Sequence, residues 1–175
     1  MEGPRLKGSQ ITSSQEGSAV QRVFGRSRVA GTIIWASRFK EVSKTTTEKA
    51  GGKSSGGSKV STTTYSYYCS FAIGLCEGPI LGIGQIWADG KPMDMADVTY
   101  RLYKGTETQN PDTKHQAVEG LDFTPGYRGL AYIVFESLLL EKYGNRIPQI
   151  QVEVYTRATK DNTGDELEEY IKGVT

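Results

Sequence analysis

Apolar and polar residues alternate most regularly between Tyr65 and Ile73, and this pattern predicts a β-strand. The apolar set occupies every second position: Tyr65, Tyr67, Cys69, Phe71 and Ile73. The positions between them form the other face: Ser66, Tyr68, Ser70 and Ala72. Because successive side chains of a strand point to opposite faces, this strand is expected to be half-buried.

A second apolar run, 80–88, follows a junction at 74–79 whose glycines and proline predict a kink. The run ends at Asp89-Gly90, a dipeptide that favours a type I′ hairpin turn because both central residues need a positive φ. A third strand is therefore expected to fold back from Lys91.

Four further segments have the β-branched and aromatic composition of strands: 28–36, 97–104, 130–135 and 150–155. Within the first, Gly31 is expected to mark a bulge or a close backbone contact. Within the second, three apolar residues share one face: Val98, Tyr100 and Leu102. Together these strands predict a mainly β fold of the barrel or sandwich type.

The segments between these strands are predicted to be less regular. Residues 105–129 hold several turn signals and predict a long loop with one helical turn at 118–121. A loop of that length usually has a binding or contact role. A second helical turn is expected at 138–143, where Gly144-Asn145 would end it.

Residues 40–64 consist mainly of Lys, Thr, Ser and Gly and offer almost nothing to bury. Their centre, 50–58, is predicted to be a mobile tip, because burial there cannot offset the entropy of ordering. The Thr-rich flanks, 41–47 and 58–64, predict a long hairpin inserted between core strands. An inter-domain linker is the alternative.

The two ends of the chain carry different signals. Residues 1–17 predict an extended arm, and residues 161–175 predict a short terminal helix. Thr163 and Glu166 have the spacing of a capping box. Two turns of helix are too short to be stable alone, so this helix is expected to dock or to lead into a missing downstream domain.

The length of 175 residues suits a single domain, 1–175, with a sizeable core. The mean hydropathy of −0.45 is that of a soluble protein. A net charge of +1 provides no overall attraction to nucleic acid or membrane. No apolar run approaches the roughly 20 residues of a membrane span, and the start lacks the apolar core of a signal peptide. Synthesis in the cytoplasm is therefore expected.

Residues suited to catalysis or metal binding are few: two cysteines and one histidine. Cys69 is expected to be a buried free thiol, and Cys76 lies at the predicted kink, so no disulfide or zinc site is expected. His115 is expected to be a solvated loop residue, with a nucleophile–base pair to Cys76 as the weaker alternative. Gly52-Lys53-Ser54 lacks the upstream glycine of a phosphate-binding loop. No cofactor is expected.

Two alternative functions remain open on the residues alone. Glu77 could act with Asp89 or Asp94 in acid–base hydrolysis, although each also has a structural interpretation. A carbohydrate- or receptor-binding β module for host attachment is the other. The preferred interpretation is a rigid, non-enzymatic scaffold for assembly.

Four segments together resemble a known family: 4–37, GLCEGPILGIGQIWADGKPM (74–93), YRLYKGTETQNPD (100–112) and 126–154, which contains the most specific motif, GNRIP. They are similar to the amino-terminal hub region of tail-tip (baseplate) hub proteins from long-tailed phages and gene transfer agents. That family includes proteins with a TIM-barrel-like domain further along, a region that is not expected within these 175 residues. The junction also resembles the lambda-type tail tip protein.

The resemblance implies a β-rich hub fold, a homotrimer ring and a place in the virion at the distal end of the tail. The implied partners are the distal tail protein, the tail tube, the tape measure protein and the receptor-binding or fibre proteins. Nucleic acid would be met only as DNA passing through the hub. The candidate assembly contacts are Arg26, Arg28, Trp35, Glu77, Pro79, Trp87, Tyr127, Arg128, Asn145 and Arg146.

Overall fold

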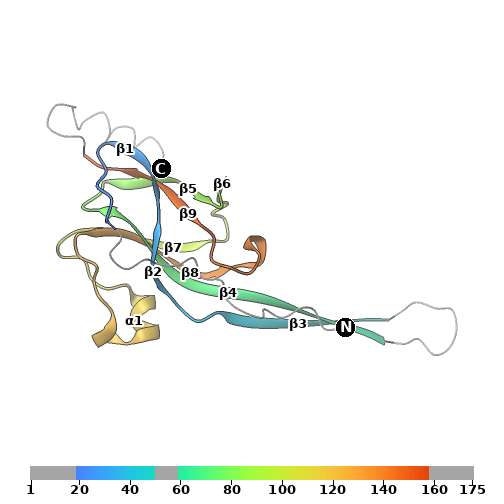
Figure 1. The fold of residues 1–175 in the computed structure, drawn as a ribbon. Coiled ribbons are helices and arrows are strands. Elements are labelled where there is room, and N and C mark those ends of the chain that lie inside the picture. Colours follow the sequence, from blue (N-terminus) through green and yellow to red (C-terminus); the bar gives the residue numbers. More distant parts are fainter. Residues whose placement is uncertain (1–18, 50–58, 158–175) are drawn as a thin grey trace.

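A computed structural model of the chain describes residues 19–49 and 59–157, which form two antiparallel sheets and one short α-helix (Figure 1). The strands are β1 (Arg26–Ala30), β2 (Thr32–Ala36), β3 (Lys40–Lys49), β4 (Lys59–Glu77), β5 (Gly82–Ala88), β6 (Lys91–Pro92), β7 (Thr99–Lys104), β8 (Leu130–Leu139) and β9 (Ile150–Tyr155). The predicted extended arm, hairpin tip and terminal helix lie outside the described residues.

The prediction of a mainly β fold is confirmed, and the arrangement is sandwich-like. The smaller sheet has the strand order β1-β9-β5-β6. The larger sheet has the order β2-β4-β8-β7, and β3 also pairs with β4. Neither sheet closes into a barrel through the strands that the structure describes.

β4 is the longest of these strands and organises the larger sheet. Its outer half pairs with β3, from Lys49 opposite Lys59 to Lys40 opposite Tyr68. Its inner half lies between β2 and β8. The predicted hairpin is therefore present, and Figure 1 shows it as a long arm that projects away from the two sheets.

The larger sheet is covered on both faces. Toward the smaller sheet, alternate residues of β4 and β8 such as Phe71 and Phe135 pack in one core with Val152 of β9. On the opposite face, Tyr132 and Trp35 belong to a second buried cluster. This cluster lies beside the helical segment 112–123, which is called the helical layer below. The described chain thus has three layers: the small sheet, the large sheet and a helical segment.

The prediction of a half-buried strand at 65–73 is wrong for its inner part. Every residue of β4 from Cys69 to Cys76 is buried, on both faces, because the helical segment covers the face that was expected to be exposed. The strand continues through Gly74 to Glu77, with register shifts against β8, and the kink predicted within 74–79 lies at Gly78-Pro79, where the strand ends. Cys76 therefore lies inside a strand.

The predicted strand at 28–36 is two strands in different sheets, separated at Gly31. A Cβ atom on this glycine would lie 2.1 Å from Cγ2 of Ile73, so the prediction of a close contact is confirmed. Its backbone N–H donates to the carbonyl of Ile150 over 2.9 Å. The absence of a side chain lets the backbone cross between the sheets against the core.

The turn predictions hold at two places. Asp89 and Gly90 both have positive φ, 49° and 79°, and the two-residue strand β6 folds back from them. The helical turn expected at 138–143 is the shorter 3₁₀ helix η2 (Glu141–Tyr143), because β8 continues to Leu139, and it ends as predicted at Gly144, which has φ 66°. The predicted apolar face of β7 is partly wrong, because Tyr100 is exposed while its neighbours Val98 and Leu102 pack on the core.

The segment 105–129 contains more structure than predicted. It holds α1 (Thr113–Glu119) and the 3₁₀ helix η1 (Leu121–Phe123), where one turn at 118–121 was expected. The side chain of Asp112 caps α1 by accepting from the N–H of His115, so the cap sets where the helix begins. None of the helices in the described ranges is long and apolar enough to span a membrane.

Candidate functional site

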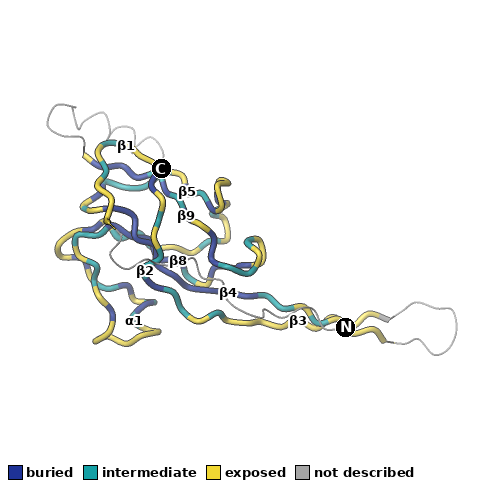
Figure 2. Tube along the Cα trace, in the orientation of Figure 1, coloured by how far each residue is buried: buried dark blue, intermediate teal, exposed yellow. Residues whose placement is uncertain are grey.

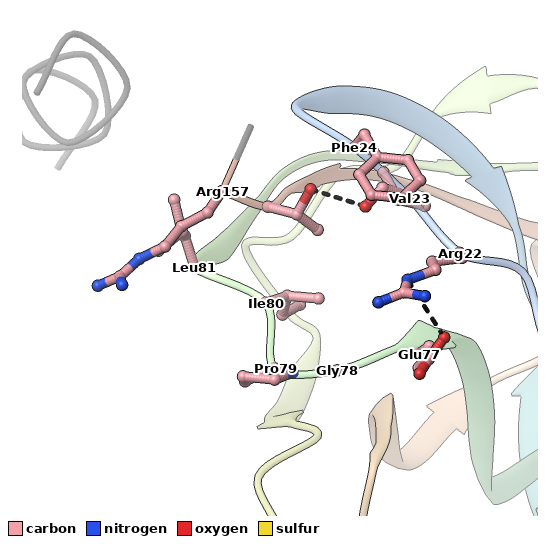
Figure 3. A pocket seen from close by; sticks show the side chains of 10 residues that line it. Arg22, Val23, Phe24, Glu77, Gly78, Pro79, Ile80, Leu81 and Arg157 are labelled. Carbon is pink, nitrogen blue, oxygen red and sulfur yellow. Dashed lines mark hydrogen bonds and ion pairs between the residues drawn. The ribbon is translucent and has the colours of Figure 1, made fainter. Parts of the chain in front are cut away.

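A pocket of about 510 Å³ opens where the described chain enters and leaves the sheets (Figure 3). Three segments line it: Arg22–Phe24, the bend after β4, and the residues following β9. Hydrogen bonds hold these segments together, since Glu77 N donates to Gln21 O over 2.8 Å and Thr156 Oγ1 donates to Val23 O over 2.9 Å. The pocket is therefore a built feature of the fold.

The pocket has an apolar centre and a charged rim. Val23, Phe24, Pro79, Ile80 and Leu81 supply the apolar surface. Arg22 and Glu77 lie on one side and Arg157 lies on the other (Figure 3). The Arg22–Glu77 ion pair spans 3.6 Å between side chains that are 69% and 53% exposed. Such an exposed pair contributes little to stability, so both groups can form other contacts.

Arg26 and Arg28 lie along β1 and reach across the outer face of the small sheet. Nε of Arg26 donates to Glu153 over 2.7 Å. The guanidinium of Arg28 lies 4.0 Å from the ring centre of Trp87 and donates to the side chain of Gln151. Both arginines, and Trp87 with them, are therefore engaged within this chain.

Trp35 is buried between the large sheet and α1. Its ring stacks on His115 at 4.3 Å, and its Nε1 donates to Glu119 over 3.0 Å. The expectation that His115 is a solvated loop residue is wrong. Burial lowers the pKa of His115, although the negative charges of Glu119 and Asp112 oppose this shift.

His115 and Cys76 do not form a nucleophile–base pair. Cys76 belongs to the core between the sheets, whereas His115 lies on the opposite face of the large sheet. Burial, together with the charge of Glu77, raises the pKa of Cys76 to about 11, so its thiol stays protonated at neutral pH. Cys69 is also a buried free thiol, as predicted.

Asp112 is the centre of a buried polar network. It accepts from Nε of Arg101 over 2.6 Å and from the hydroxyl of Tyr103 over 2.9 Å, besides capping α1. Burial alone would raise the pKa of this carboxyl, but these bonds lower it overall. Arg101 also donates to Glu136, which pairs with Lys114 of α1. The network fixes the helical layer to β7 and β8.

The loop after η1 is also fixed. Gln109 donates to the carbonyls of Tyr127 and Leu130 over 2.5 and 3.0 Å. Tyr127 has a φ of 46° and packs edge-on against Tyr132 at 5.2 Å. Arg128 follows it and is exposed. Of these two predicted contacts, Arg128 is thus the one that faces solvent.

The GNRIP segment is tied to the Asp89 turn. Arg146 donates to Asp89 over 2.9 Å, and Asp89 also accepts from the N–H of Gln149. Asn145 has a left-handed φ of 57°, and its buried side-chain oxygen has no hydrogen-bond partner among the described residues. This motif therefore fixes two loops to each other.

The carboxylates considered for hydrolysis have structural partners. Glu77 pairs with Arg22, Asp89 pairs with Arg146, and Asp94 accepts from the N–H of Ala96 over 3.1 Å. No group of three His, Cys, Asp or Glu residues within 19–49 and 59–157 could hold a metal ion. Gly84 gives room to Tyr155 and Glu153.

The chain is similar to one solved structure in particular. A chain of the "Virion of native gene transfer agent (GTA) particle" matches it with 37% sequence identity and a TM-score of 0.66. The match covers 97% of this chain and 35% of the other, so this chain spans about a third of that protein. No family model matches, and no curated protein matches.

The segment 105–129, for which a contact role is expected, carries exposed apolar side chains that its turn signals do not predict. Leu121 and Phe123 of η1 are 74% and 79% exposed, and Val118 of α1 lies beside them in sequence and is exposed as well. Exposed large apolar side chains close together in one segment favour a contact surface. These apolar positions at 118, 121 and 123 are visible in the sequence, but their exposure depends on how the segment packs.

Proposed function

We propose that this chain is a structural subunit of the tail-tip or baseplate hub of a phage or gene transfer agent particle. The observation that carries the proposal is the match of almost the whole chain to a virion chain, at 37% identity. The GNRIP motif and the GLCEGPI junction, which resemble tail hub proteins, favour the hub over other places in the particle.

The geometry suits assembly better than catalysis. The projecting β3–β4 arm has an exposed surface along most of its length (Figure 2). Two large apolar residues of η1, Leu121 and Phe123, are also exposed. The groups with shifted pKa values, such as Asp112 and His115, are used to hold layers together. A scaffold needs such rigid layers and exposed contact surfaces more than it needs a polar cleft.

The proposed assembly is a homotrimer ring at the distal end of the tail. The distal tail protein, tail tube and tape measure protein would lie on its tube side, and receptor-binding or fibre proteins on the other. DNA would pass through the ring during delivery. Head-to-tail contacts between identical chains close into such rings, and they bring different surfaces of neighbouring copies together.

Electron microscopy of labelled particles tests the placement. Antibody raised against this chain, coupled to gold, is applied to purified particles that contain it. The proposal expects gold at the distal tip of the tail in most labelled particles. Gold on the head, along the tube or only on released protein contradicts the hub.

The mass in solution tests the ring separately. A trimer of the 19.2 kDa chain has a mass of about 58 kDa, three times the monomer. Light scattering is preferable to charge reversal at Arg26 and Arg28 as a test, because those side chains bind Glu153 and Trp87 within the chain. Arg128 is exposed, so Arg128→Glu is the charge reversal to use in place of those at Arg26 and Arg28. A monomer at all concentrations contradicts self-assembly of the isolated chain.

A further inference from the structure

The pocket between Arg22 and Arg157 has a chemical character that a short acidic and apolar peptide would match. Its centre is apolar, with Phe24, Pro79 and Leu81 reaching its surface. Its rim carries two arginines and one glutamate, a net charge of +1. Arg157 makes no ion pair with any residue in the described ranges.

Such a peptide follows the pocket directly in the sequence. Residues 163–171 read TGDELEEYI, with four acids between apolar residues. Leu167 and Ile171 are four apart and so fall on one face of the helix that the sequence predicts. Of the acids, Glu168 lies beside that face, whereas Glu169 lies on the opposite side of the helix. The segment therefore combines apolar side chains for the centre with carboxylates for the rim.

The connection is short enough to favour contact within one copy. Arg157 lies on the pocket rim, and residues 158–164 span at most about 23 Å when extended. A tether of this length gives an effective concentration in the millimolar range, so a weak contact is sufficient for occupancy.

From this geometry we propose that residues 163–171 dock in the pocket of their own chain. Leu167 and Ile171 cover Phe24, Pro79 and Leu81, and carboxylates of the segment pair with Arg22 and Arg157. Docking fixes the direction in which the chain leaves the two sheets. The proposal goes beyond the hub assignment, because it concerns the isolated chain and holds whether or not the chain is a hub.

Disulfide trapping in the full chain tests this contact. The first variant combines Leu81→Cys in the pocket with Leu167→Cys in the segment. The control combines Val118→Cys, which is exposed on α1, with the same Leu167→Cys. Native Cys69 and Cys76 are buried and are expected to stay out of the reaction. Both variants are oxidised at micromolar concentration, and products are separated by non-reducing electrophoresis and mass spectrometry.

The expected result is an internal disulfide in the first variant, formed at least tenfold faster than in the control. Adding Arg22→Glu and Arg157→Glu should slow this reaction severalfold, and adding Glu168→Arg to that variant should restore part of the rate. Equal rates in the first variant and the control overturn the proposal. Disulfides that form only between copies also overturn it, since the segment would then belong to a neighbouring chain.

Discussion

The two halves of β4 belong to one continuous strand but have opposite environments. From Cys69 to Cys76 every residue is buried, and Phe71 and Ala72 have no exposed surface. From Lys59 to Thr62 every residue is exposed, and Figure 2 shows this change along the arm. The inner half is covered by the small sheet and the helical layer, whereas the outer half has β3 as its described neighbour.

This difference separates two tasks within the same strand. The inner half provides hydrophobic stability, because burial removes apolar area from water on both faces. The outer half is held by the backbone ladder with β3 and by contacts such as the Thr45–Thr63 hydroxyl pair at 3.0 Å. A ladder with so little buried area contributes little stability by itself. The exposed surface of the arm is therefore available for contacts with other chains, whereas the buried inner half is not.

The largest effect is expected from a cavity in the inner half. Phe71→Ala removes a fully buried ring that stacks on Phe135 at 5.1 Å, and it should cost about 3–5 kcal/mol of unfolding free energy. Val60→Ala in the outer half is the control and should change stability by less than about 0.5 kcal/mol. Urea denaturation of both variants checks this difference. Similar losses would show that the arm is part of the core.

The next effect concerns the layer that buries the second face of the inner half. Asp112→Ala removes the cap of α1 and leaves Arg101 without its closest carboxylate. The cost should be about 2–3 kcal/mol, below the usual range for buried pairs, because Arg101 is 31% exposed and regains some hydration. Tyr103→Phe removes one bond to the same carboxylate and should cost about 1 kcal/mol.

Trp fluorescence provides a second measurement for Asp112→Ala. Trp35 lies under α1, whereas Trp87 lies on the small sheet. If the helical layer detaches locally, quenching of Trp35 should increase before global unfolding. A fully cooperative transition with unchanged quenching would mean that the layer and the sheets unfold together.

The two halves also differ in what the sequence revealed about them. The Thr-rich composition of 40–64 predicted the arm, since its flanks alternate and pair locally. The alternation at 65–73 predicted the strand but also an exposed face, and that was wrong. Local periodicity does not reveal a layer contributed by residues 112–119, some 40 positions away. The cap signal at Asp112 was the available clue to that layer.

The same limit applies to the candidate contacts. Arg26, Arg28 and Trp87 are among the candidate assembly contacts, and the structure pairs them within the chain. Trp35 is buried against His115. Whether a polar or aromatic side chain finds its hydrogen-bond or ring partner within the same chain depends on which residues the tertiary structure brings close. Spacing along the sequence does not contain that information.

A smaller effect should appear in the pH dependence of stability. His115 has a pKa below its usual 6.5 in the folded chain, mainly because it is buried. As pH falls below about 6.5, the unfolded chain binds a proton that the folded chain does not bind, so stability decreases until the folded pKa is passed. The loss is about 1.4 kcal/mol for each unit of difference between the two pKa values.

His115→Phe should remove this pH dependence while keeping a ring against Trp35. The comparison is the unfolding free energy of both chains at pH 7.5 and pH 5. His115 is the one histidine of the chain, and the lowered pKa values of Asp112 and Glu136 place their own losses at more acidic pH. A pH dependence that is unchanged in the variant would assign it to other groups.

The smallest effect on stability is expected from shortening the arm. Thr45 and Thr63 are opposite each other, so replacing residues 46–62 by Asn-Gly joins them through a two-residue hairpin turn. The variant should keep its unfolding free energy within about 1 kcal/mol, because residues 46–48 and 59–62 of the removed segment are exposed. If the chain is a hub subunit, the same variant should be incorporated into particles at a reduced level, measured by immunoblot of purified particles.

A variant that is equally stable and equally incorporated would mean that the arm makes no essential contact. A large loss of stability would mean that the outer half of β4 supports the inner half, contrary to the separation argued here.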